Sequence, residues 1–474
     1  MHGCIHSKRL VFVLAAIIVA ASAGLAWAQV AESAYPLAAD PAYAISAQPV
    51  ASNFNAPKGQ GLEGRVAELE AALAKMKSKE ADAKKKAEGK PSVQAGGRIQ
   101  WDWMANTQDA IGFAQQNQPD GTEFRRARIF IKGGAFHVVD YKIQMDFADT
   151  AKGDGGSTIQ STAFKDVYIT IKELPLIGHV RAGHFKEPFG LEQLTSARFI
   201  TFMERSTSDE NMFVPARNTG VMIFDHTENE RATWAVGGFV SKESAEPPVY
   251  KSDNRGGLAF TGRATWLPWY DEATEGRGLI HLGLSYTYRD MDDNTQRFRM
   301  RPESHIADYV IDFTLNDVPS WQVLDFETAL VYGPFSVQAE FFNTFIRRTA
   351  NPDPTLQGMY VYFSYFLTGE HRTYKRSGGV FDRVTPYENF FRVRAEDGCV
   401  YTGKGAWELA YRFSYLDTNR GGIDGGILAD HTIGVNWYLN PYTRLMWNYV
   451  NSGLTNGLGR GYTDLFQMRC QIDF

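Results

Sequence analysis

Arginine is the residue type with the clearest chemical potential in this sequence. Arg125, Arg126 and Arg128 crowd into the stretch Phe124-Arg-Arg-Ala-Arg-Ile-Phe130. Arg126 and Arg128 share one face of any strand formed here, because alternate side chains point the same way. The guanidinium group is always charged and binds oxyanions through paired hydrogen bonds. A row of such groups along an aqueous passage would favour anions.

A second group of arginines lies in residues 192–218. Arg198, Arg205 and Arg217 occur there together with the acids Glu192, Glu204, Asp209 and Glu210. Two interpretations stay open. The arginines either face a passing anion, or they pair with these acids and only pin the segment in place.

These arginines need a scaffold, and from Val93 onward the sequence predicts strands. Residues 127–132, 141–147 and 408–415 alternate between apolar and polar side chains. The last ten residues, 465–474, do the same and end on Phe474. Such strands are apolar on one face and polar on the other, which is typical of an outer-membrane barrel with lipid outside and a polar lumen inside.

The connections between the strands favour the same architecture. Long stretches at 108–121, 150–162, 189–216, 242–256, 291–322 and 453–463 contrast with tight turns at 227–230, 332–334 and 439–441. Both ends should lie on the periplasmic side, which makes the strand number even. We therefore expect an all-β transmembrane barrel of about 16 antiparallel strands. Residues 371–404 form an unusually long periplasmic connection that could enter the lumen.

The N-terminus resembles an export signal. Lys8 and Arg9 precede an apolar run at 10–23 and a small-x-small site at Ala26-Trp-Ala28. The alternative, a single anchor helix, would need about 20 apolar residues. We predict a cleaved signal peptide at 1–28 and export to the outer membrane.

Residues 29–59 are rich in Ala, Pro and Ser and are expected to form a flexible linker. Residues 60–90 carry a short heptad seam at Leu62, Val66, Leu69, Leu73 and Met76. An isolated helix this short is marginal. We predict a periplasmic coiled coil that helps a homotrimer to form; the alternative is a solvated helix without a partner. Residues 91–474 are expected to form the barrel.

Composition and motifs narrow the function. The formal net charge of −5 gives no uniform field for nucleic acid or for anions, so any attraction must come from local charge. No HExxH, GxSxG or CxxC pattern occurs. We expect no catalytic residues, no cofactor, no metal and no nucleic-acid partner.

Several segments carry a family resemblance. Residues 185–192 (Phe-Lys-Glu-Pro-Phe-Gly-Leu-Glu), with Thr195-Ser196, Phe202 and Glu204-Arg205, resemble the strand-to-loop signature of the phosphate-selective porin O/P family. Residues 124–127, 164–168 and 366–370 resemble other segments of it, and the likeness runs from 93 to 474. It implies a sixteen-stranded trimeric porin with inward-folded loops, arginines along the pore wall and a central lysine–arginine site.

The resemblance also assigns residues. Arg125 and Arg126 match the arginine pair, and Arg205 matches the constriction arginine. Asp166 matches an acid near the constriction, and Ser196 a hydroxyl donor. The position of the central lysine is occupied by Gln193. Glutamine donates a hydrogen bond but brings no charge, which should weaken a compact site for phosphate.

We therefore expect an outer-membrane porin for passive diffusion of small hydrophilic solutes, with a preference for inorganic or organic anions such as phosphate. Residues 192–218 should form the constriction. The residues expected to contact the ion are Arg125, Arg126, Arg128, Asp166, Gln193, Ser196, Arg198 and Arg205. The alternative is a largely plugged barrel that serves as an envelope tether, with 291–322 and 371–404 as the plug.

Overall fold

The computed structural model describes residues 90–108, 118–148, 150–152, 158–160, 163–208, 212–240, 257–394, 399–457 and 459–474. The expected signal peptide, linker and nearly all of the expected coiled coil lie outside the described residues, as do Asp209 and Glu210. Among the described residues, no helix is both long and apolar enough to cross a membrane.

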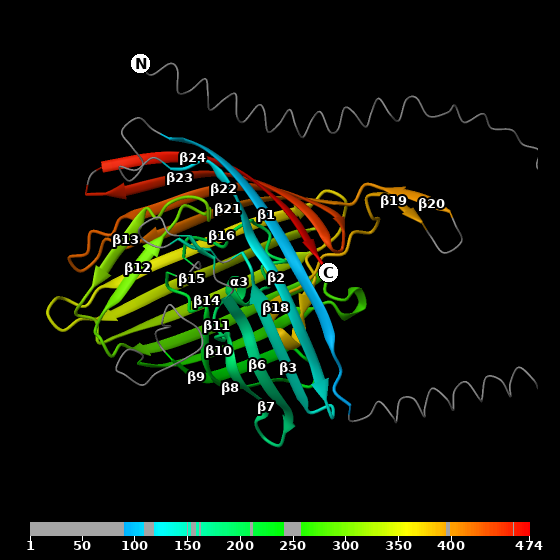
Figure 1. The fold of residues 1–474 in the computed structure, drawn as a ribbon, viewed down its shortest axis with the longest axis horizontal. Coiled ribbons are helices and arrows are strands. Elements are labelled where there is room, and N and C mark those ends of the chain that lie inside the picture. The colour runs from blue at the N-terminus through cyan, green and yellow to red at the C-terminus, as the bar shows by residue number, and fades with distance from the viewer. Residues whose placement is uncertain are drawn as a thin grey trace, which may run out of the picture. The chain divides into compact units, whose positions relative to one another are not determined.

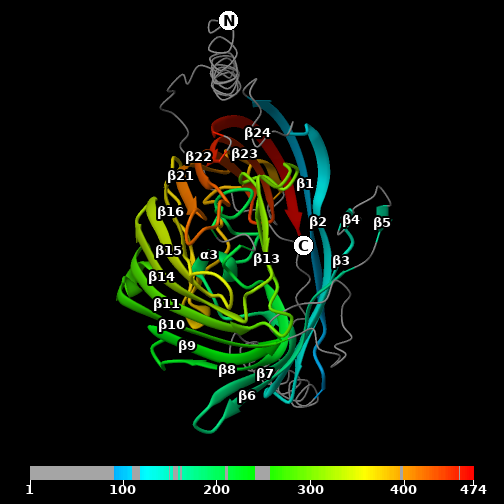
Figure 2. The same ribbon diagram turned by 90° about the vertical axis from the view of Figure 1, so that its left-hand side faces the viewer.

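The described chain forms a closed barrel of sixteen strands, each antiparallel to both neighbours, as the alternating pattern predicted (Figures 1 and 2). The last strand pairs with the first and closes the sheet. The barrel strands are β1 (Gln94–Gln108), β2 (Gly121–Ala135), β3 (Val139–Asp146), β6 (Ala163–Leu174), β7 (Gly178–Lys186), β8 (Arg217–His226), β9 (Ala232–Val240), β10 (Leu258–Tyr270), β11 (Gly278–Asp290), β14 (Ser320–Tyr332), β15 (Phe335–Arg347), β16 (Thr355–Phe366), β21 (Ala406–Asp417), β22 (Ile427–Asn440), β23 (Thr443–Asn456) and β24 (Gly459–Asp473).

The two faces of the sheet differ as the sequence predicted. On β24, Gln467, Arg469 and Gln471 are buried inside the barrel, whereas Ile472 and Phe474 are 45% and 63% exposed on its outer surface. Exposed apolar side chains continue around the barrel on other strands, for example Ile169, Leu282, Phe341 and Ile433. The strands therefore present a lipid-compatible outer surface and a polar lumen.

The barrel has a turn end and a loop end. The turn end carries the short turns, such as 136–138, 175–177 and 227–231, and the start of β1 and the end of β24. The loop end carries the longer connections. The predicted long loop at 453–463 is wrong, because β23 and β24 stay paired as far as Asn456 and Gly459. Its glycines suggested a loop, but Gly453 lies in the strand against the ring of Tyr462 on the partner strand.

Much of the barrel interior is filled by chain that folds inward. Residues 187–216, which we call the inner segment, connect β7 to β8 and include the short helix α3 (Leu191–Leu194). Residues 291–319 enter from the loop end and form a hairpin of β12 (Gln296–Met300) and β13 (Ile311–Leu315). Phe202 and Phe213 of the inner segment and Phe298 of the hairpin share one apolar core with the barrel wall.

The long connection at 371–404 divides into two parts. The first contains β17 (Tyr374–Lys375), the helical turn η3 (Arg376–Gly378) and β18 (Val380–Phe381), and it enters the turn end of the barrel. The Tyr374 hydroxyl lies 2.7 Å from His281 Nδ1, and Arg263 donates to the Gly379 carbonyl at 2.9 Å. The second part, the hairpin of β19 (Phe391–Arg394) and β20 (Val400–Gly403), projects away from the barrel (Figure 1).

The small hairpin of β4 (Thr150–Lys152) and β5 (Thr158–Gln160) belongs to a loop-end connection, and η2 (Glu272–Thr274) lies in a turn between β10 and β11. Neither joins the barrel wall.

Candidate functional site

A β-bulge places two neighbouring arginines inside the barrel. Gln100 of β1 faces Arg126 and Trp101 faces Phe124, so Arg125 is an extra residue on β2. Phe124 is 59% exposed on the outer surface, and Arg126 is buried inside. The bulge interrupts the alternation of faces and brings Arg125 to the lumen beside Arg126. Strict alternation had put only Arg126 and Arg128 on that face.

A second bulge repeats this arrangement on β6. Ile143 of β3 faces Val167 and Met145 faces Phe164, so Lys165 and Asp166 together oppose a single residue. Both of them reach the lumen. Sequence reasoning missed Lys165. The available signal was the shared pattern of an aromatic residue followed by two charged ones, which occurs in both bulged strands.

The lumen retains a cavity of about 1030 Å³, and all eight residues predicted from the sequence line it. Of the described residues around it, eighteen are basic and only three, Asp140, Asp166 and Asp225, are acidic. The basic residues are Arg98, Arg125, Arg126, Arg128, Lys132, Lys142, Lys165, Lys172, Arg181, Lys186, Arg198, Arg205, Arg217, Arg263, Arg297, Arg299, Arg301 and Lys375. The cavity is therefore strongly basic although the whole chain carries −5.

Asp166 is neutralised by its neighbours. Its carboxylate accepts hydrogen bonds from Lys142 Nζ at 2.5 Å and from Arg217 Nε at 2.6 Å. Between β2 and β3, Arg128 Nε donates a hydrogen bond to the carboxylate of Asp146 at 2.5 Å. These pairs orient the basic side chains while leaving a surplus of positive charge.

Arg98 and Arg126 have spare hydrogen-bonding capacity. Both are buried, and within the described part of the chain the Nε atom of each has no hydrogen-bond partner. Arg126 donates through Nη1 to Gln100 at 3.0 Å, and its nearest carboxylate, that of Glu204, lies 3.9 Å away. Since buried donors are normally satisfied, these two guanidinium groups are suited to a passing anion.

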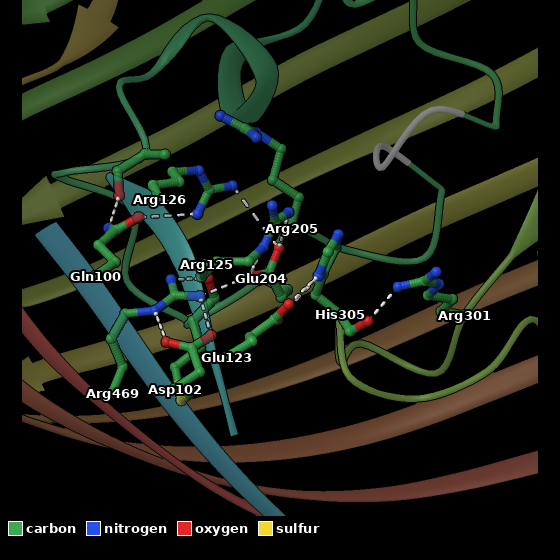
Figure 3. A network of polar contacts seen from close by, with 12 residues as sticks. Gln100, Asp102, Glu123, Arg125, Arg126, Glu204, Arg205, Arg301, His305 and Arg469 are labelled. Atoms are coloured by element: carbon green, nitrogen blue, oxygen red, sulfur yellow. Dashed lines mark hydrogen bonds and ion pairs between the residues drawn. The ribbon is translucent and has the colours of Figure 1, made fainter. Parts of the chain in front are cut away.

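Glu204 ties the inner segment to the barrel wall (Figure 3). Arg125 donates to it twice, at 2.8 and 2.9 Å, and Arg469 once, at 2.6 Å. Burial opposes ionisation, but the guanidinium groups of Arg125, Arg126 and Arg469 outweigh it and hold the pKa of Glu204 well below its usual range. Arg125, which comes from β2, thus pairs with an acid of the inner segment.

Arg205 holds α3 in place through backbone carbonyls. Its guanidinium donates to the carbonyls of Glu192, Gln193 and Thr195 at 3.0, 3.3 and 3.2 Å. The Gln193 carbonyl also accepts a hydrogen bond from Lys186 Nζ. Lys186 thus brings an ammonium next to the position where the family resemblance expected a lysine.

Ser196 and Arg198 lie together on the same segment. The Ser196 hydroxyl accepts from the Arg198 backbone and from its Nε, both at 3.4 Å. Arg198 Nη1 lies 3.5 Å from Asp473 at the end of β24. The acid that engages Arg198 therefore belongs to the barrel wall and not to the inner segment.

Three further arginines, on β12 and directly after it, had not been predicted. Arg297, Arg299 and Arg301 line the cavity, while Phe298 and Met300 between them are buried in the apolar core. Arg299 and Arg301 stack on the ring of Tyr309, at 4.5 and 4.2 Å from its centre. The signal was present, because the alternation over residues 296–301 is that of a strand with one basic face.

A cluster of buried carboxylates supports α3. Oxygen atoms of Asp325, Glu327 and Glu340 lie within 4.8 Å of one another. Glu340 accepts hydrogen bonds from the backbone N–H groups of Leu191 and Glu192 at 2.6 and 3.0 Å, and Glu327 accepts from Arg263. The first N–H groups of a helix have no partner within the helix, and Glu340 supplies one for them. The carboxylate cluster thereby positions the inner segment.

Comparisons with known proteins agree with this architecture. Residues 93–474 match the family model described as phosphate-selective porin O and P. Porin O of Pseudomonas aeruginosa is 27% identical over 426 residues, which cover 81% of this chain and 88% of that protein. An uncharacterized protein of Caulobacter vibrioides is 26% identical over 371 residues, 76% of this chain and 68% of that one.

Solved structures with a similar fold include the anion-selective porin from Comamonas acidovorans, with a TM-score of 0.48 and 10% identity over 81% of this chain and all of that one. The family match covers the whole barrel, including every residue discussed above. The chain therefore belongs to the phosphate-selective porin O and P family and is an outer-membrane porin.

Proposed function

We propose that the pore conducts small hydrophilic solutes passively and prefers anions. The observation that carries this proposal is the charge of the cavity, where the described lining has eighteen basic residues and three acids. A narrow, low-dielectric passage lined with one sign of charge concentrates counter-ions and repels co-ions. An anion entering from the loop end would meet the arginines of β12 first and then those at the bulge of β2.

We propose that an oxyanion is held by Arg98, Arg126 and Arg128. Arg98 faces Arg128 in the β1–β2 register, and Arg126 lies two residues away from Arg128 on the same face of β2. Phosphate can accept several of their hydrogen bonds at once. Lys186 and Gln193 would add a charge and an amide beside them. Arg125, Asp166, Ser196, Arg198 and Arg205 would orient this region.

Planar-bilayer recording under a KCl gradient tests the proposal. We expect a reversal potential on the chloride side, and block of the current by added phosphate at sub-millimolar concentration. A weak preference for chloride without block by phosphate would show that the arginines mainly pair with acids of the wall and hold the inner segment. If the inserted protein gives no measurable current, the plugged tether would be favoured, because the segments that enter the barrel from both ends would then close it.

We further propose that residues 1–28 are removed on export and that residues 60–90 assist a homotrimer. Mass spectrometry of the mature protein should place its first residue at Gln29. Native mass measurement should give three copies for the full mature chain. A variant with Leu69 and Leu73 changed to Asp should assemble less completely; unchanged assembly would leave the barrel surface as the source of any trimer contact.

A further inference from the structure

One part of the pore wall is apolar. On strands β6 to β9 the cavity wall contains the partly buried Tyr168, Phe224 and Ala235, packed against the buried Phe185 and Met222. Exposing apolar side chains to water costs free energy, and the lumen of a porin is otherwise polar. Tyr168, Phe224 and Ala235 nevertheless keep part of their apolar surface open to the cavity, and contiguous exposed apolar surface marks ligand-binding sites.

A cation sits at the centre of this patch. The Arg181 guanidinium lies 4.1 Å from the ring centre of Tyr168, 4.9 Å from that of Phe224 and 5.5 Å from that of Phe185. Its Nε donates to the Thr170 hydroxyl at 3.0 Å. The rings hold the cation through their π faces without neutralising it.

The charged neighbours of Arg181 lie close to carboxylates, whereas Arg181 does not pair with one among the described residues. Lys172 pairs with Asp140 at 3.1 Å, and His179 lies 3.9 Å from Asp225. Within the described ranges, no carboxylate pairs with Arg181. Its Nη groups therefore remain available to an anionic ligand, in a place where apolar surface is also offered.

The backbone is shaped to accommodate the rings. At the lumen-facing positions Gly220 and Gly237, an added Cβ would meet the ring of Phe239 at 2.5 and 2.8 Å. At Gly183, where φ is +134°, an added Cβ would lie only 2.2 Å from the carbonyl oxygen of Val167 on the neighbouring strand β6. Glycine is needed at these positions, so that the aromatic layer can lie close against the sheet.

We propose that this patch is a subsite for aromatic carboxylates. The carboxylate would pair with the Nη groups of Arg181, and the ligand ring would lie against the partly buried Phe224. A sugar would leave its hydroxyl groups unpaired there, and a neutral aromatic compound would gain nothing from the positive cavity. The inference rests on the proposed anion pathway, and it adds a class of organic substrate that the arginines of β1 and β2 alone would not distinguish.

Benzoate and acetate are the probes that test it. In planar bilayers bathed in KCl, benzoate should block the chloride current at a concentration at least tenfold lower than acetate. Phe224→Ala and Arg181→Gln should each bring benzoate and acetate to the same blocking concentration. Phe341→Ala, on the lipid-facing side of β15, should keep the tenfold difference. The mobility of unheated protein in detergent gels would confirm that each variant is folded.

The outcomes separate the two proposals. Equal block by benzoate and acetate in a wild-type channel that is clearly anion-selective would overturn the subsite and leave the proposed function standing. A benzoate preference that survives both Phe224→Ala and Arg181→Gln would also overturn it. A wild-type channel without anion selectivity would overturn the proposed function and the subsite with it.

Discussion

Arg126 lines the cavity and keeps part of its hydrogen-bonding capacity unused within the described residues. It is buried in the wall, keeps one N–H without a partner among the described residues and has no carboxylate closer than 3.9 Å. We expect Arg126→Gln to lower the chloride-to-potassium permeability ratio about fivefold, because one unit charge at about 4 Å is worth about 1 kcal/mol even in water. Reversal potentials measure this ratio directly.

Arg420 provides a matched control for this prediction. It lies on the loop end, its side chain is 55% exposed and it pairs with Asp417 at 2.8 Å. Arg420→Gln removes the same charge without changing the described cavity lining, so the permeability ratio should remain that of the wild type. Equal effects of the two substitutions would mean that net surface charge, and not the pore wall, sets the preference.

The sequence predicted eight residues that all line one cavity, but it did not predict their partners. The family resemblance supplied Arg125, Asp166, Gln193, Ser196 and Arg205. The alternation of faces identified Arg126 and Arg128 as lumen positions. It could not identify Lys165, because a bulge breaks the alternation. It also could not show that Glu204 binds Arg125 and Arg469, since these contacts join residues far apart in the chain.

At the scale of elements, the inner segment depends on Glu204. Its carboxylate neutralises guanidinium groups from both β2 and β24. Glu204→Gln should leave part of that buried charge uncompensated, a kind of change that costs up to about 3–5 kcal/mol. We expect larger open–closed fluctuations in single-channel current. Glu228→Gln, in an exposed turn, should leave the current as quiet as that of the wild type.

The hairpin of β12 and β13 should respond to pH through His305. Its Nδ1 lies 2.8 Å from Glu123. Burial, and repulsion by Arg125, hold the pKa of His305 below its ordinary value, and the hydrogen bond to Glu123 opposes them only in part. A His305 released from this contact would titrate near about 6.5. Protonation therefore favours release, and the docked hairpin loses stability as pH falls below that value.

Channel recordings between pH 7 and pH 5 would measure this effect. Closing events should become more frequent as the pH falls, and His305→Gln should make their frequency independent of pH over this range. If the wild-type frequency is constant or decreases on acidification, the contact between His305 and Glu123 does not hold the hairpin.

Element types were more predictable than their endpoints. The sixteen strands follow from period-2 alternation. The strand-like run at 305–314 was correctly left out of the barrel, because β13 pairs only with β12 in a separate hairpin. The long loop expected at 453–463 failed, because glycine and asparagine in a paired strand have the composition of a loop. Which connections enter the lumen is decided by distant contacts, such as that of Tyr374 with His281.

The interior of the barrel is packed with apolar side chains on one side and contains the basic cavity on the other. The apolar core of the interior packs against β14 to β16 and β21 to β23. The cavity is lined mainly by β1 to β3 and β6 to β10, together with the inner segment and β12. The packed side narrows the lumen of the barrel to a passage with basic walls. It also gives the inner segment a rigid support.

The whole barrel depends on the seam between its first and last strands, because open sheet edges are not tolerated in a membrane. Arg469 of β24 crosses this seam: it is fully buried and donates to Asp102 of β1 at 2.7 and 2.6 Å. Arg469→Met leaves Asp102 buried without its partner, so the free energy of unfolding should fall by about 3–5 kcal/mol. Urea unfolding in lipid vesicles, followed by tryptophan fluorescence, measures it. Arg297→Met, which breaks the exposed pair of Arg297 with Asp312, should cost about 0–1 kcal/mol. Equal stability of the two variants would mean that backbone pairing alone closes the barrel.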